Sequence, residues 1–252
     1  MIWVFAHNIE CNYFRNKIKI SKLYMYIPYK KVVHSEKVTY NHADYIMALT
    51  NRDATLIHKI YNKKVDMVLP MSFYDIYDNS KANVTVQPNN ELLFIGSMFG
   101  PNYEGIKWFV ENVMVELPDY HLSIVGKNFE TRKNLQKENV TVVGTVDDLE
   151  PYYYSNNIMV MPIFYGDGMK IKTAEAMMYG KIILASDEAL EGYEVKNIKG
   201  IYRCNTKEDY INCLKMINYD NTETQLEVRK LFTEKYSLEV QIKNCKKIWR
   251  YQ

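Results

Sequence analysis

Residues 158–185 read IMVMPIFYGDGMKIKTAEAMMYGKIILA, and this stretch decides the fold. Its two ends, 158–162 and 182–185, are apolar runs typical of strands that are buried on both faces. The loop between them holds the sequence GDG at 166–168. The apolar spacing after that loop predicts a helix over residues 170–179. A strand, a helix and a second strand in this order predict a parallel βαβ unit.

The same alternation continues along the chain in both directions. Further strands are predicted at 2–6, 45–49, 65–69, 92–96, 121–125, 140–143 and 200–203, and further helices at 51–61, 103–116 and 148–154. Three of these strands end in Gly, as LLFIG, LSIVG and VTVVG. A Gly at the carboxyl end of a parallel strand opens the crevice where doubly wound folds bind ligands. We therefore expect an α/β protein whose main sheet is parallel.

Composition excludes several classes of protein. The 252 residues include 32 Lys+Arg and 30 Asp+Glu, and this balance argues against a dedicated nucleic-acid binder. The hydrophobic fraction of 47% is typical of a globular chain and too high for disorder. The four Cys form no C-x-x-C pair and are expected to be reduced thiols of a cytoplasmic protein. No apolar run approaches the roughly 20 residues of a membrane span.

The loop at 166–168 and the helix after it could bind a phosphorylated ligand. Loop N–H groups and a helix N-terminus form an anion site, and Lys170 and Lys172 add positive charge. Glu175 lies one turn further on, where a carboxylate could accept hydrogen bonds from ribose hydroxyls. The alternative is a Gly turn followed by a helix with solvated Lys and Glu. From the residues alone both interpretations stand.

Residues 92–195 resemble the donor-binding half of GT4-type retaining glycosyltransferases, which have the GT-B fold. Four blocks in register carry the resemblance: LLFIGSMFGPNYEGIKWF, LSIVG, VTVVGTVDDLEPYYYSNN and GDGMKIKTAEAMMYGKIILASDEALEG. The resemblance implies a complete Rossmann-like donor domain at 91–220, after a linker at 76–90. It also implies a partial Rossmann-like acceptor-side domain at 1–75 and C-terminal helices at 221–252 that pack back on it.

The resemblance also assigns roles to residues of the donor half. Glu175 would accept hydrogen bonds from the donor ribose, and Asp167 would act near the sugar or phosphate, or else serve as a turn residue. The donor-binding set is Gly96, Ser97, Asn102, Thr145, Val146, Gly166, Gly168, Met169, Lys170, Lys172 and Glu175. Ser97 and Asn102 stand near positions where many relatives carry Arg and Lys, which moves the countercharge to Lys170 and Lys172. There is no Asp-x-Asp, so we expect no metal and no other cofactor.

The N-terminal segment HNIE at 7–10 resembles an acceptor-side motif of the same family, and places His7 as a catalytic candidate. A complete acceptor domain of this family has several more strands before this point. Three explanations stand: a naturally short chain, a start further upstream, or a partner that supplies the missing half.

The expected function is transfer of a sugar, with retention, from a nucleotide-sugar to a saccharide or lipid-linked acceptor. The resemblance places this reaction in cell-surface polysaccharide or glycolipid synthesis, in the cytoplasm or at the inner face of the membrane. Peripheral membrane association, and a partner chain or homodimer, are left open; no nucleic acid is expected. The alternatives are a non-catalytic or degenerate sugar-nucleotide-binding subunit and a GT-B enzyme such as an epimerase.

Overall fold

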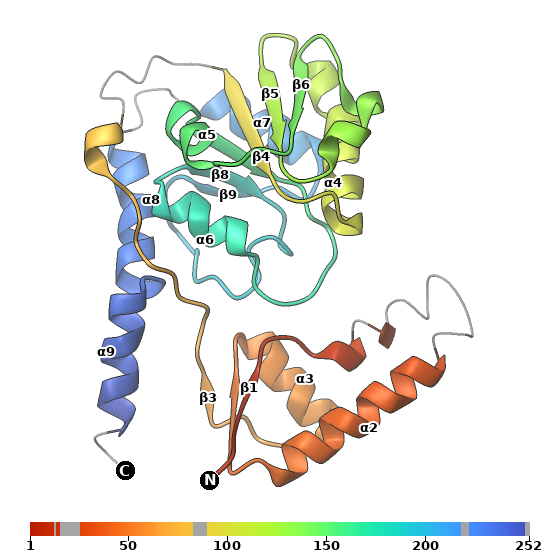
Figure 1. Cartoon of the computed structure of the whole chain (residues 1–252). Coiled ribbons are helices and arrows are strands. Elements are labelled where there is room, and N and C mark those ends of the chain that lie inside the picture. The colour runs from red at the N-terminus through yellow and green to blue at the C-terminus, as the bar shows by residue number, and fades with distance from the viewer. Residues whose placement is uncertain (13, 16–25, 83–89, 218–221, 250–252) are drawn as a thin grey trace. The chain divides into compact units, whose positions relative to one another are not determined.

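The computed structural model describes residues 1–12, 14–15, 26–82, 90–217 and 222–249 (Figure 1). The chain forms two compact units, each described here by itself. The first unit contains Met1–Met71 together with Gly166–Met169 and Glu191–Glu194. The second contains Ser72–Tyr165, Lys170–Leu190 and Val195–Gln252.

The first unit is a small parallel sheet with helices. Its strands are β1 (Trp3–Ala6), β2 (Tyr45–Ala48) and β3 (Met67–Val68), paired in that order, and its helices are α2 (Tyr26–His42) and α3 (Asn51–Tyr61). All three strands were predicted, although β3 is shorter than the apolar run at 65–69. Thr50 starts α3 by accepting a hydrogen bond from the Asp53 N–H. Such an N-cap satisfies an N–H that has no partner inside the helix.

The second unit contains a six-stranded parallel sheet. The strands are β4 (Glu91–Ile95), β5 (His121–Val125), β6 (Val140–Gly144), β7 (Ile158–Met161), β8 (Ile182–Ala185) and β9 (Ile201–Arg203). They lie in the order β6-β5-β4-β7-β8-β9. This is the strand order of a doubly wound Rossmann-type sheet, and its direction of progression reverses between β4 and β7. Ligands of such folds bind outside the carboxyl ends of the strands at this reversal.

Helices cover both faces of this sheet. They include α4 (Gly100–Asn112), α5 (Glu150–Ser155), α6 (Ile171–Met178) and α7 (Lys207–Met216). Helix α8 (Thr222–Lys235) packs against α6 and β8, and α9 (Leu238–Trp249) follows α8 and lies away from the sheet (Figure 1). Alternate strand residues such as Leu92 and Phe94 pack with residues of α4 and α7 in one cluster. The residues between them, such as Leu93 and Ile95, are buried as well. Burial on both sides explains why these strands are continuous apolar runs.

Several predicted helix ends differ from the observed ones. Helix α4 begins at Gly100 rather than 103, because Pro101 fits the first turn of a helix. It ends at Asn112, and a separate 3₁₀ turn follows over Met114–Glu116. Helix α5 begins at Glu150 rather than 148, again with a Pro in its first turn.

The C-terminal helices group with the second unit. The sequence predicts an apolar stripe of Leu226, Leu231, Val240, Ile242 and Ile248; Leu231 is buried, but Leu226 and Ile242 are 63% and 44% exposed. Helix α8 buries Val228 and Phe232 together with Leu231, spaced three and four residues apart as on one helix face. Leu226 lies two positions before Val228 and therefore on the other side of the helix. The packing of these helices on residues 1–75 stays a prediction, and so do the predicted domain limits. Residues 83–89, which are part of the predicted linker, lie outside the described residues.

Candidate functional site

Three glycines stand at neighbouring strand ends. The Gly96 N–H donates to Val125 O at 3.0 Å, and the Gly126 N–H donates to Gly144 O at 2.7 Å. Gly126 has a φ of +141°, and a Cβ there would overlap the Gly96 carbonyl. The ends of β4, β5 and β6 therefore meet without side chains between them, which leaves backbone at the mouth of the crevice.

Four predicted donor-binding residues converge at the end of β4. Lys172, in the first turn of α6, donates from Nζ to Asn102 Oδ1 at 2.7 Å. The Asn102 amide in turn donates to Ser97 O at 2.8 Å. A Cβ on Gly96 would lie 2.6 Å from Lys172 Nζ, so a side chain at this position would displace the end of the lysine. The ammonium also lies 4.9 Å from the centroid of the Phe94 ring.

This environment lowers the pKa of Lys172 from 10.5 to about 7. Burial is the main cause, the charge of Lys170 adds to it, and Glu175 partly offsets both. The ammonium donates its hydrogen bond to the neutral amide of Asn102. An anionic ligand beside Nζ would stabilise the charged form and raise this pKa again.

Lys170 has a different environment. Its Nζ forms an ion pair with Glu188 Oε1 at 2.7 Å, and the two side chains are 14% and 15% exposed. Glu188 was missed by the sequence analysis, although it lies just after β8, at the edge of the sheet where sites form. The positive charge predicted at Lys170 is therefore accompanied by a carboxylate of the protein itself.

Glu175 also has a partner that the sequence analysis missed. The Tyr153 hydroxyl, on α5, donates to Glu175 Oε2 at 2.9 Å. The Tyr153 ring is stacked on Tyr179, with centroids 4.5 Å apart and an interplanar angle of 3°. The only sequence signal was the YYY run at 152–154, which does not say which of the three rings is buried.

Thr145 and Val146 follow the end of β6, two strands along from β4. Thr145 is exposed, and its N–H donates to Glu130 Oε2 at 3.1 Å. Backbone N–H groups, first that of Glu130 itself, hold the pKa of this carboxyl below its usual value. Val146 is half-buried. The place predicted for a nucleotide base thus carries an acidic neighbour, Glu130, that the sequence analysis did not identify.

The remaining predicted residues lie in the first unit. Asn12 Nδ2 donates to Asp167 Oδ1 at 2.9 Å. Gly168 has a φ of +66°, and a Cβ there would lie 3.3 Å from His7 O and would overlap Asn8 Oδ1. The exposed His7 ring packs edge-on against Phe5. The backbone turn at His7 and the loop with Asp167 are therefore neighbours.

Met169 and Gly166 belong to the same part of the first unit. Met169 Sδ accepts a hydrogen bond from the Met71 N–H at 3.5 Å. A Cβ on Gly192 would lie 2.6 Å from Met169 Cγ, so this side chain is tightly held. Gly166 has a φ of +153°.

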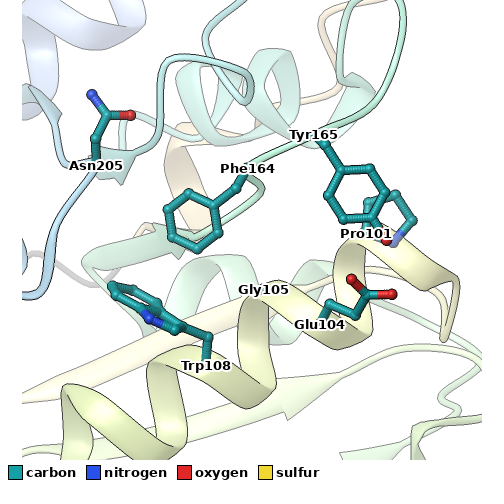
Figure 2. Close-up of a pocket in the computed structure, with 7 residues that line it drawn as sticks. All are labelled: Pro101, Glu104, Gly105, Trp108, Phe164, Tyr165 and Asn205. Carbon is teal, nitrogen blue, oxygen red and sulfur yellow. The ribbon is translucent and has the colours of Figure 1, made fainter. Parts of the chain in front are cut away.

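A separate groove of about 380 Å³ lies beside α4 (Figure 2). Its lining includes three aromatic side chains and consists of Pro101, Glu104, Gly105, Trp108, Phe164, Tyr165 and Asn205. The Trp108 and Phe164 rings meet edge to face at 4.8 Å. A Cβ on Gly105 would overlap Pro162 O, so this glycine lets α4 approach the chain after β7. Sequence reasoning missed the groove because its residues come from three separate segments.

Among the described residues, no group of three His, Cys, Asp or Glu side chains could hold a metal ion. The expectation of a metal-free reaction stays a prediction. None of the helices in the described ranges is both long and apolar enough to cross a membrane.

Residues 89–212 match the family model described as Glycosyl transferases group 1. This stretch, just under half of the chain, is similar to the group 1 glycosyltransferases. A curated relative from Klebsiella pneumoniae, "Uncharacterized 44.6 kDa protein in cps region", is 26% identical over 134 residues. That match covers 47% of this chain and 32% of the relative, so it spans about a third of the relative's length.

Solved glycosyltransferase structures share the fold. Sucrose-phosphate synthase from Thermosynechococcus elongatus matches with a TM-score of 0.75 and 18% identity, over 99% of this chain and 67% of that one. HepE from Anabaena, solved with UDP and glucose, matches at 0.72 and 10%, over 99% and 71%. WaaG, a glycosyltransferase involved in lipopolysaccharide biosynthesis, matches at 0.70 and 15%, over 97% and 74%. The predicted GT-B fold with Rossmann-like domains is thereby confirmed, and the match of residues 89–212 agrees with the resemblance to glycosyltransferases.

Proposed function

We propose that this glycosyltransferase binds the diphosphate of a nucleotide-sugar at the carboxyl ends of β4 and β7, and transfers the sugar with retention of configuration. The observation that carries the proposal is the position of Lys172. Its ammonium is held by Asn102 beside Gly96, at the point where the strand order reverses. Doubly wound folds bind ligands at this point, and a partly buried ammonium there suits an anion.

The start of α6 supports the same assignment. Lys170 occupies the N-cap position, and no side chain caps the helix. The first N–H groups of an uncapped helix are ready donors for a phosphate, and the helix dipole favours negative charge at this end. Diphosphate binding would thus combine the first backbone N–H groups of α6 with the Lys172 ammonium, and Lys170 would contribute through its pair with Glu188.

The finer roles extend the proposal to the rest of the donor. Glu175 would accept hydrogen bonds from the ribose, and Thr145 and Val146 would contact the base. His7 and Asp167 are the catalytic candidates, supported by the closeness of the His7 backbone to the loop of Asp167. Stabilising the negative charge that develops on the leaving nucleotide is the main catalytic work expected of such a site. We assign no covalent nucleophile, metal or cofactor.

The acceptor and pathway are proposed more broadly. We propose a saccharide or lipid-linked acceptor, in cell-surface polysaccharide or glycolipid synthesis. The similarity to WaaG, which is involved in lipopolysaccharide biosynthesis, and to a relative from a cps region supports this proposal. We further propose that the reaction takes place in the cytoplasm or at the inner face of the membrane, where the protein would associate peripherally. A partner chain or a homodimer is also part of this proposal.

A titration tests the donor site. UDP and GDP are titrated calorimetrically into the wild-type chain and into Lys172→Met. We expect the variant to lose at least about ten-fold in affinity, the scale of one hydrogen bond to a charged group. Lys107→Met is the matched control, because Lys107 lies on α4 and pairs with Glu111. Unchanged affinity of Lys172→Met would place the diphosphate elsewhere.

Turnover separates an enzyme from a binding subunit. A sugar nucleotide is incubated with the protein and a saccharide or lipid-linked acceptor, and the anomeric configuration of the product is read by NMR. A product with the donor's configuration supports retention. Tight UDP binding without product under any acceptor tested would support the non-catalytic alternative.

A further inference from the structure

The Glu175 carboxylate is held on one side only. Tyr153 donates to Oε2 at 2.9 Å, whereas Oε1 accepts no hydrogen bond from any residue that the structure describes. Tyr153 is 2% exposed, and Glu175 is half-buried. A carboxylate has lone pairs for several hydrogen bonds, so Oε1 retains its full capacity to accept them from a ligand.

The donor of this hydrogen bond is itself immobilised. The Tyr153 ring lies flat against Tyr179, and Tyr179 also meets Tyr154 and Tyr77 edge to face. Burial, and then the charge of Glu175, raise the pKa of Tyr153 far above its usual value, so the phenol keeps its proton. Its hydroxyl is therefore a permanent donor at a fixed place.

A fixed donor changes what the carboxylate can do. A free Glu side chain samples several rotamers, and restricting it to one of them on ligand binding costs conformational entropy. The hydrogen bond from Tyr153 already restricts the Glu175 side chain before any ligand binds. Preorganisation of this kind raises affinity without any new contact to the ligand.

We propose that Tyr153 is a positioning residue, which holds the Glu175 carboxylate so that its other oxygen receives the ribose hydroxyls of the nucleotide-sugar. This inference rests on the proposed function, in which Glu175 binds the ribose. Tyr153 itself touches no substrate in this scheme, and acts through Glu175.

The test measures ribose preference rather than affinity alone. UDP and 2′,3′-dideoxy-UDP are titrated into the wild type, Tyr153→Phe and Tyr154→Phe. Tyr153→Phe keeps the stacked ring and removes the hydroxyl. Tyr154→Phe is the matched control, because Tyr154 lies on the same helix and its hydroxyl bonds to the Asp78 backbone instead. Thermal melting of each variant reports whether it folds.

We expect the wild type to bind UDP at least about ten-fold more tightly than the dideoxy analogue. Tyr153→Phe should lose most of this preference, through weaker UDP binding with little change for the analogue. Tyr154→Phe should keep the preference. If Tyr153→Phe weakens both ligands equally, or keeps the wild-type preference, the inference is overturned.

Two variants of Glu175 separate this inference from the proposed function. Glu175→Ala should remove the preference; if it does not, the ribose assignment itself fails. Glu175→Asp keeps the charge but draws it away from the Tyr153 hydroxyl by one methylene, and should remove most of the preference too. If Glu175→Asp keeps the full preference while Glu175→Ala abolishes it, a carboxylate without this positioning is sufficient, and Tyr153 has no such role.

Discussion

Raising the pH from 7 to 9 should weaken the binding of a nucleoside diphosphate, because Lys172 loses its proton over this range in the free protein. Burial and the charge of Lys170 lower its pKa to about 7. A diphosphate beside Nζ favours the charged form, so the pKa of Lys172 is higher in the complex. Binding above pH 7 therefore takes up a proton at this residue, whereas binding well below pH 7 does not.

The size of the effect follows from the fraction of neutral lysine. With a pKa of about 7, about half of the Lys172 side chains are neutral at pH 7 and about 99% at pH 9. If the complex restores an ordinary lysine pKa of about 10.4, the dissociation constant rises about 50-fold between these two pH values, or about 2.3 kcal/mol. The terminal phosphate contributes little, because its pKa of about 6 leaves it largely ionised throughout.

Calorimetric titration of UDP at pH 7, 8 and 9 measures this dependence. Repeating the pH 8 titration in two buffers of different ionisation enthalpy counts the protons, and about 0.9 should be taken up for each UDP bound. Lys172→Arg is the decisive variant, because a guanidinium stays charged throughout this range. Its affinity should vary little with pH. Lys107→Met should keep the full wild-type dependence.

Two results would refute this reasoning. A wild-type dissociation constant that is flat from pH 7 to 9, without proton uptake, would mean that Lys172 is already charged in the free protein or lies away from the ligand. A dependence that survives in Lys172→Arg would assign the proton to another group.

Three further changes test the geometry around the strand ends. Asn102→Ala removes the acceptor of the Lys172 ammonium and should weaken UDP binding by about three- to ten-fold, as measured by calorimetry, with no change in Tm beyond a few degrees. Gly126→Ala should lower the free energy of unfolding by about 2 kcal/mol or more in urea titrations, because its φ of +141° and the Gly96 carbonyl both exclude a Cβ. Lys170→Met should raise the UDP dissociation constant less than Lys172→Met does. It should also lower Tm, because it leaves the half-buried Glu188 carboxylate without its cation, and the double variant Lys170→Met/Glu188→Gln should recover part of that loss.

The sequence could predict the strands of the second unit well, because a strand buried on both faces is a continuous apolar run. All six predicted strands exist with ends shifted by a residue or so. Their order could not be read from periodicity, because an apolar run carries no information about its neighbours in the sheet. The helix starts at Gly100 and Glu150 were misplaced because the Pro in each first turn was not used as a start signal.

The candidate site was predicted in part. Local pattern placed Lys172 and Gly96 at strand and helix ends, and parallel topology brings such ends to one edge. The partners Tyr153 and Glu188 were missed, because each stands 18 or more residues from the side chain that it contacts. Only the fold decides which tyrosine of the YYY run is buried against α6, or which acidic residue after β8 reaches Lys170.

These partners change how charge is distributed in the proposed diphosphate site. The sequence assigned countercharge equally to Lys170 and Lys172, in place of the Arg and Lys of many relatives. The structure separates them, because Lys170 lies against a carboxylate and Lys172 against the neutral amide of Asn102. A cation that is already paired gives an incoming anion less net attraction than a desolvated cation with a neutral partner. In the proposed site, Asn102 would therefore hold the lysine whose positive charge an incoming diphosphate increases most.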